Sequence, residues 1–312
     1  MQTYKDQIPV LDALRGLAAV LVGFPIALIL SWMFDITPQG IQRTAPVRSD
    51  AEAFRSIAVL PFANFSDDPG NEYFSDGLAE EIRDQLSKVP GLRVAARTSS
   101  FAFKGRNEDA REIGRRLDVG LILEGGVRKH DDTVRISVQL VDTRRGYQLW
   151  SATFERKLQD IFRVQSEISG SILEYMHLRV LDHGVMQQPT SDFDAYNLYL
   201  LGRHHFHKRT ELALNRAVEY FTEARNRDPQ FALAYSGLAD ALSLLSTGYY
   251  GNLPVAESIA KALPAAQRAL AIAPDSAEAH ASMGLIRDNQ KDYDGAMASL
   301  QHAIKLRPTY TL

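Results

Sequence analysis

The sequence predicts an α/β domain followed by an all-α repeat solenoid, with a membrane helix near the amino terminus. Short apolar strands alternate with amphipathic helices between residues 55 and 182. Small residues and prolines then recur at a regular spacing over residues 195–312. A run of 18 residues without a charge, residues 17–34, precedes both regions. The predicted boundaries are 1–34 for the amino-terminal flank and membrane helix, 35–54 for a linker, 55–182 for the α/β domain, 183–194 for a second linker and 195–312 for three repeats.

The uncharged run at residues 17–34 has the length of a membrane span. As a helix it extends about 27 Å, at ~1.5 Å per residue, against a bilayer core of about 30 Å. A signal peptide and a buried core helix are the alternatives. Pro25 in the middle of the run and the lack of a small-residue cleavage site after it argue against a signal peptide. Two basic residues precede the run and three follow it, so their distribution predicts no orientation.

Composition excludes several function classes. The 312 residues carry 35 basic and 38 acidic side chains, a net charge of −3, so no global field favours nucleic acid or an acidic membrane surface. We therefore expect no direct nucleic-acid binding by this chain. The sequence has no cysteine, which excludes disulfides, thiolate metal sites and cysteine nucleophiles.

The α/β domain is predicted element by element from residue 56. The expected order is β-α-β-α-β-β-β-α, with strands at 56–62, 92–96, 119–127, 131–143 and 146–158 and helices at 72–89, 108–117 and 160–181. Apolar residues recur every four positions in the first helix, which predicts one buried face. They occupy every second position in the strand 131–143, which is the period of a half-buried strand. In the last strand Trp150 lies in the more continuous apolar row, so we expect it to face the core.

An acidic stretch, SDDPGNEYFSDGLAEEIRDQL, opens the first helix. Its first residues are turn formers, Ser75 or Asp76 can cap the helix, and acidic side chains favour a helix amino end. We therefore expect Glu80 and Asp84 to lie on a solvated face opposite the apolar stripe. A small-ligand or partner contact and paired catalytic carboxylates are the alternatives. A calcium loop needs a spacing that this stretch lacks.

The segment RTSSFAFKG follows the second strand, where α/β sheets place ligands. Ser99, Ser100 and Lys104 are candidate anion-binding residues in this loop. A surface loop whose phenylalanines fold into the core is the alternative. No glycine-rich nucleotide-binding pattern occurs, so we expect no nucleotide phosphate site and no cofactor.

The repeats predict a concave groove. The third unit, residues 277–310, fits a period of about 34 residues without gaps, while the first and second carry about three and eleven extra residues. The first helix of each unit should line the groove, and the mixed charge of that lining favours a peptide or protein partner. A groove covered by the chain itself is the alternative. The side chains expected there are Tyr196, Tyr199, Arg203, His207, Asp240, Glu278, Asp288 and Asn289.

Three histidines in the segment HHFH raise the question of a metal site. His204 and His207 can share one face of a helix, because they are three residues apart. Zinc sites need three or four ligands, and no third ligand accompanies them at a suitable spacing. We therefore expect no metal site and no catalytic constellation.

These motifs resemble two known families. The stretches SIAVLPFANFSDDPGNEYFSDGLAEEI, LRVAARTSSFAFKG, LEGGVRK and GYQLWSATFERKL resemble the TolB-like amino-terminal domain family, and the segment GFPIALILSWMFDITPQGIQRT resembles the membrane segment and linker before it. The units after residue 195 resemble tetratricopeptide repeats. The first resemblance implies a bacterial inner-membrane protein with a single span, in a family whose domain is not known as a catalyst.

The resemblance implies two functions. The first is a non-enzymatic, membrane-anchored interaction or sensor module that recruits a protein partner through its repeats. The alternative is the sensory half of a signalling protein, a nucleotide cyclase or a winged-helix regulator, whose output domain is absent from this chain. The final TYTL looks like the start of another repeat, so we also expect the repeat array to continue beyond residue 312.

Overall fold

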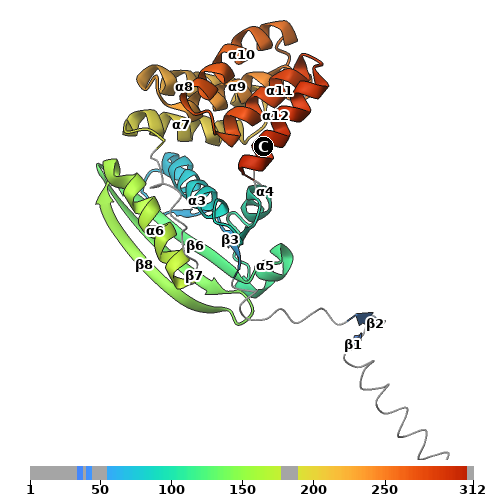
Figure 1. Ribbon diagram of the computed structural model, residues 1–312. Coiled ribbons are helices and arrows are strands. Elements are labelled where there is room, and N and C mark those ends of the chain that lie inside the picture. Colours follow the sequence, from blue (N-terminus) through green and yellow to red (C-terminus); the bar gives the residue numbers. More distant parts are fainter. Residues whose placement is uncertain (1–33, 38–39, 44–54, 177–188, 308–312) are drawn as a thin grey trace, which may run out of the picture. The chain divides into compact units, whose positions relative to one another are not determined.

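The computed structural model describes residues 34–37, 40–43, 55–176 and 189–307 (Figure 1). By its internal contacts the chain divides into two units, Met1–Ser49 and Asp50–Leu312, and each is described by itself.

The described part of the first unit is a β-hairpin. Strand β1 (Phe34–Thr37) pairs antiparallel with β2 (Gly40–Arg43), and Ile36 lies opposite Ile41. Residues 35–37 and 40–43 of this hairpin fall within the segment 35–54 that the polar composition predicts to be a linker.

The predicted membrane helix falls almost wholly outside the described residues. Residues 17–33 lie outside them, and Phe34, the last residue of the predicted span, begins β1. In the parts of the chain that the structure describes, no helix combines the length and the hydropathy needed to cross a membrane.

The second unit begins with a mixed sheet. Its strands follow the order β5-β3-β6-β7-β8, with β4 also pairing with β6. Strand β3 is parallel to β5 and β6, whereas β6, β7 and β8 form an antiparallel meander. The strands are β3 (Ser56–Val59), β4 (Ala63–Asn64), β5 (Arg93–Val94), β6 (Leu121–His130), β7 (Thr133–Asp142) and β8 (Tyr147–Lys157).

Helices cover both faces of this sheet. Helices α3 (Glu72–Ser87) and α6 (Ile161–Tyr175) pack on one face through the large apolar cluster, and α5 (Ala110–Leu117) packs on the other through a smaller one (Figure 1). The alternation along β3 explains both contacts, because Ile57 faces α3 while Ala58 faces α5. Short helical turns η1 (Pro69–Asn71), α4 (Arg97–Phe101) and η2 (Leu158–Asp160) complete this region.

Three antiparallel helix pairs follow. Asp192 caps the first, and its side chain accepts a hydrogen bond from the amide of Ala195; Thr210 and Ser276 cap later helices in the same way. Close packing depends on small residues, since a Cβ on Gly202 or on Gly237 would lie within 2.7 Å of the Phe221 ring. The helices are α7 (Phe193–Phe206), α8 (Glu211–Arg227), α9 (Ala232–Leu245), α10 (Val255–Ile272), α11 (Ala277–Asn289) and α12 (Tyr293–Leu306).

The predicted fold class is therefore confirmed as an α/β sheet region followed by helical repeats. The inward row of β7 is buried as expected, and Trp150 of β8 packs, half-buried, against the same core. The expected loop after the second strand instead begins with the helix α4. The core itself is continuous, because one buried apolar cluster extends from the sheet through α6 and α7 to Ile286 of α11.

Candidate functional site

The polar contact between α3 of the sheet region and α7 of the repeats is the candidate site. The helices approach closely, because a Cβ on Gly77 of α3 would lie 2.7 Å from a methyl group of Leu200. Tyr196 of α7 is 0% exposed, and its hydroxyl accepts a hydrogen bond from Gln165 of α6 at 2.7 Å. Two helices of the sheet region therefore cover the first helix of the repeats.

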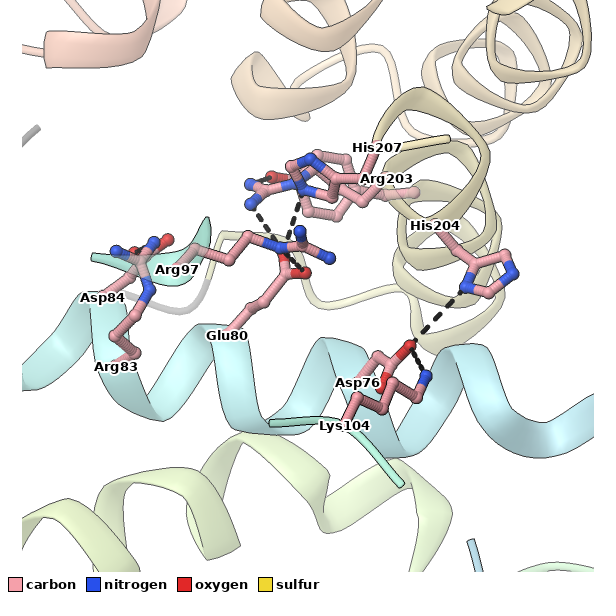
Figure 2. Close-up of polar contacts among 10 residues, drawn as sticks. Asp76, Glu80, Arg83, Asp84, Arg97, Lys104, Arg203, His204 and His207 are labelled. Atoms are coloured by element: carbon pink, nitrogen blue, oxygen red, sulfur yellow. Dashed lines mark hydrogen bonds and ion pairs between the residues drawn. The ribbon is translucent and has the colours of Figure 1, made fainter. Parts of the chain in front are cut away.

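Glu80 lies at the centre of this contact (Figure 2). Its side chain is only 5% exposed, and it accepts hydrogen bonds from Arg97 of α4 and, at 2.7 Å, from Arg203 of α7. His207 Nε2 lies 3.3 Å from the same carboxylate. Two elements, α4 and the end of α7, thus converge on one acidic side chain of α3.

The electrostatics of this cluster favour a charged carboxylate. Burial alone would raise the pKa of Glu80, but His207, Arg203 and Arg97 outweigh it and hold that pKa well below its usual range. Burial lowers the pKa of His207. Glu80 acts to raise that pKa, whereas Arg203 and Arg97 lower it further. Arg97 and Arg203 thus both supply positive charge that keeps Glu80 ionised.

A second acidic side chain, one helical turn before Glu80, makes a similar contact. Asp76 accepts a hydrogen bond from Lys104 at 2.5 Å, and Nδ1 of His204 lies 3.7 Å from the same carboxylate (Figure 2). Lys104 also pairs with Glu72 at 2.8 Å. Hydrogen bonds to these two acids raise the pKa of Lys104 although burial acts to lower it.

These contacts correct the expectation for the acidic stretch. Asp68 does cap the turn η1, where its side chain accepts from the amide of Gly70. Glu80, however, is buried, and Asp84 is largely covered beside Arg83 instead of lying on a solvated face. The physical reason is that the apolar stripe of α3 faces the sheet, while its polar face meets a second partner that local periodicity does not reveal.

The helix α4 separates the three side chains of the candidate ligand loop from one another. Ser99 is exposed, Ser100 is fully buried, and Lys104 is engaged with Asp76 and Glu72. The three side chains therefore do not converge on one cavity.

The eight residues expected in the repeat groove fall into three places. Tyr196, Tyr199, Arg203 and His207 lie at or beside the contact with α3. Asp240 and Glu278 line a recess next to it. Asp288 is exposed, whereas Asn289 donates to the hydroxyl of Ser246, the residue that follows α9, at 3.2 Å.

The recess lies between α3 and the inner helices of the repeats. It has a volume of about 60 Å³ and opens beside a wider groove of about 690 Å³, with which it shares Asp84, Glu278 and Arg307. Burial raises the pKa of Asp240 in the recess to about 7, and that of Glu81 beside the wider groove also to about 7. The recess thus combines apolar walls with charged groups from both parts of the chain.

The histidine segment contributes to the interface. His204 contacts Asp76, His207 contacts Glu80, and His205 packs against Tyr220 with ring centroids 5.4 Å apart. In the part of the chain that the structure describes, no three histidine or acidic side chains are grouped so that they could hold a metal ion.

A further depression of about 870 Å³ lies over parts of β6, β7 and β8 and is lined by both polar and apolar side chains. Among the polar ones, the hydroxyls of Ser137 and Thr153 on neighbouring strands lie 3.2 Å apart. This is the pattern of an antiparallel sheet with one solvated face.

Sequence reasoning missed the residues that complete the α3–α7 contact, including Asp76, Arg97 and Gln165. One signal was present. Acidic side chains at i and i+4 on α3 match basic ones over one turn of α7, and opposite charges at matching spacing favour helix pairing.

A curated relative shares much of this sequence. Over 235 residues the chain is 36% identical to "Putative adenylate cyclase 3" of Rhizobium meliloti (strain 1021), a match that covers 74% of this chain and 40% of that protein. The chain thus spans well under half the length of this relative. No family model matches the chain. The expectation that the protein is not an enzyme is contradicted, because this relative carries the name of an enzyme.

Two solved structures show a limited likeness to part of the chain. A lipoprotein of Neisseria meningitidis, GNA1162, is 20% identical with a TM-score of 0.31, and the match covers 38% of this chain and 96% of that one. The LpoB carboxyl-terminal domain of Salmonella enterica is 14% identical with a TM-score of 0.29, covering 36% of this chain and 87% of that one. Likeness at this level supports no conclusion about function.

Proposed function

We propose that residues 55–307 form the regulatory and partner-binding region of a nucleotide-cyclase-type signalling protein. The observation that carries this proposal is the 36% identity to a protein named as an adenylate cyclase over 235 residues. Since the match covers 40% of that relative, the proposal concerns the role of this region within such a protein.

The α3–α7 contact supports a regulatory role. A ligand or partner that binds one of two coupled elements shifts the equilibrium of the other by its differential affinity. Here the sheet region and the repeats share a continuous apolar core and the buried Glu80 cluster. Binding at the repeats would therefore be transmitted to the sheet region.

The finer features of the proposal come from the sequence. The sheet region acts as a TolB-like domain, the helix pairs as tetratricopeptide repeats that recruit a protein partner, and residues 17–34 as an anchor in the bacterial inner membrane. The length of the uncharged run supports the anchor, and the small residues between helices support the repeats.

A segment exchange tests the proposed function. Residues 55–307 replace the matching segment of the cyclase relative, and cyclic AMP formation from ATP is measured for this chimera, for the deletion lacking the segment, and for the present chain alone. The chimera should keep a cyclase rate, and the Glu80→Gln change, with folding checked by circular dichroism, should shift that rate. The Glu219→Gln change at an exposed position of α8 is the matched control.

Equal rates in the chimera, the deletion and both variants would contradict the proposal. Cyclic AMP formation by the present chain alone would place catalysis within these residues and would replace regulation as their role.

A further inference from the structure

The recess between α3 and the repeats is lined by ionisable groups from opposite walls. Arg83 and Asp84 come from α3, and Ser236 and Asp240 come from consecutive turns of α9. The volume of about 60 Å³ exceeds the space of roughly 30 Å³ that one water molecule occupies in the liquid. It can therefore admit a small polar group as well as water.

Most of the charges at this recess are already balanced. Arg83 pairs with Asp84, Arg203 pairs with Glu80 at 2.7 Å, and Arg307 pairs with Glu278 at 2.9 Å. Each of these arginines thus has a neighbouring carboxylate, although Glu80 is shared between Arg203 and Arg97, and Nε of Arg83 has no hydrogen-bond partner in the described part of the chain.

Asp240 is the exception. It is 8% exposed, and among the described residues no ion pair includes it and its Oδ1 has no hydrogen-bond partner. The hydroxyl of Ser236, one turn earlier, is likewise buried without a hydrogen-bond partner in the described part of the chain. A buried polar atom without a partner costs about 1–3 kcal/mol, so two on one helix face point to a missing group.

The missing group should be a cation. An ionised carboxylate in this setting is stabilised by a positive charge and by N–H donors, both of which an ammonium or guanidinium group supplies. Aromatic side chains of Tyr199, Phe206 and Phe221 form the adjoining wall. Arg203 and Arg209 of the chain already lie over the rings of Tyr199 and Phe206, so this wall accepts cationic groups. An anion would instead meet the carboxylate of Asp240, while Arg83, Arg203 and Arg307 each have a carboxylate partner.

We propose that Asp240 and Ser236 form a binding site for an ammonium or guanidinium group that enters the recess between α3 and α9. The group belongs either to a free small amine or to a lysine or arginine side chain of a protein partner. In both cases the cation lies between the repeats and the sheet region and can act as a regulatory ligand. The proposed function does not depend on such a ligand.

The binding should depend on pH in a defined direction. With a pKa of about 7 in the empty recess, Asp240 is mostly neutral at pH 6 and mostly ionised at pH 8, so cation binding should be roughly tenfold tighter at pH 8. Glu81 of α3 has a similar pKa but lines the wider groove, not the recess. The charged or titratable groups that face Asp240 from the surrounding helices are Arg83, Asp84, Arg203, His207, Arg209, Glu278 and Arg307.

Calorimetry on the full chain tests the site. The probes are methylammonium chloride and Nα-acetyl-lysine amide, with sodium chloride and Nα-acetyl-norleucine amide as matched controls for ionic strength and for the uncharged side chain. We expect at least one cationic probe to bind the wild-type chain and the Asp288→Asn variant equally at pH 8. The Asp240→Asn variant should bind it at least tenfold more weakly and without dependence on pH, and Ser236→Ala should weaken it severalfold.

The two probes distinguish the source of the cation. Preference for Nα-acetyl-lysine amide supports a side chain of a protein partner, and preference for methylammonium supports a free amine. Circular dichroism and the midpoint of thermal unfolding establish that each variant is folded. Equal affinity of the wild type and Asp240→Asn, or no binding of either cation to the folded wild type, would mean that the recess holds water only. Since binding is measured directly, neither result depends on the outcome of the cyclase chimera.

Discussion

Glu80 receives guanidinium groups from two elements that are distant in sequence, Arg97 of α4 and Arg203 of α7. Arg203 also donates to the hydroxyl of Tyr199 at 3.0 Å, which fixes the orientation of its side chain. Buried ion pairs add little stability relative to an apolar contact, yet removing one partner leaves the others uncompensated. Glu80 therefore contributes more to the specific docking of the two regions than to their stability.

The substitution Glu80→Gln should lower the free energy of unfolding by about 3–5 kcal/mol, because it leaves buried arginine charges without their carboxylate. Urea denaturation of the full chain measures this. The control Glu219→Gln removes an exposed acid on α8 that pairs with Arg216, and should leave the denaturation midpoint unchanged. If the denaturation midpoint of Glu80→Gln equals that of the control, Glu80 is solvated, as the sequence predicts, and the buried contact is wrong.

Asp240 should make stability fall as the pH rises. Its pKa is raised to about 7 by burial, so the folded state holds a proton that the unfolded state has lost above about pH 4. That contribution is complete below the unfolded pKa and disappears as the pH rises through about 7.

The Asp240→Asn variant should accordingly gain stability relative to the wild type between pH 4 and pH 7, by at most about 1.4 kcal/mol per pH unit. Urea denaturation at several pH values measures the difference, with Asp288→Asn as the exposed control. Glu80 has the opposite sign, since its lowered pKa contributes stability that is lost only on acidification below about pH 4.5. A pH-independent difference between Asp240→Asn and the wild type would contradict the raised pKa.

At the scale of elements, α7 has partners on several sides. It packs against α8 and α9 through small and aromatic residues, and against α3 through a mixed apolar and polar face. Phe221 of α8 fills the space left by glycines on both α7 and α9. The Phe221 ring, and the lack of a Cβ atom at Gly202 and Gly237, therefore set the distance between the first two helix pairs.

The substitution Gly202→Ala should destabilise the repeats by about 1–3 kcal/mol, because the added methyl group would lie 2.6 Å from the Phe221 ring. Thermal unfolding measures this effect. Gly170→Ala in α6 is the matched control, since a Cβ there meets nothing within 4 Å and alanine is the better helix former. Combining Gly202→Ala with Phe221→Leu should recover part of the loss, and a Gly202→Ala chain as stable as the wild type would show that the helices can separate freely.

The sequence predicts elements well where a period or a cap defines them. The alternation in β7 and the four-residue spacing in α3 identify the buried faces correctly, because each pattern is local. The burial of Glu80 could not be predicted in this way, since it depends on a contact with Arg203, 123 residues away in the chain. The repeat register predicts that Asp240 faces the groove. That its Oδ1 lacks a hydrogen-bond partner depends on the packing of several helices, which the sequence pattern does not contain.

At the scale of the molecule, the sheet region and the repeats should respond together. The apolar cluster crosses from Phe162 to Tyr196, whose rings lie 4.5 Å apart in an edge-to-face arrangement. Elements that share a core tend to open as one cooperative unit, whereas elements at the end of a repeat array open separately.

Hydrogen exchange of the full chain should therefore show that Glu80→Gln reduces the protection of α3 and α7 together, and leaves that of α12 within error of the wild type. Mass spectrometry of peptic fragments measures this. Loss of protection confined to α3 would mean that the two regions are not coupled through this contact.

The polar α3–α7 contact also has a kinetic consequence, because both of its sides belong to one chain. A covalent connection gives such partners an effective concentration on the order of millimolar. Once the two sides separate, they therefore find each other again far more readily than two free molecules at micromolar concentration would. Separation also exposes the apolar core that the two regions share, so it is a cooperative opening of both regions. A ligand that competes for this contact must therefore wait for that opening.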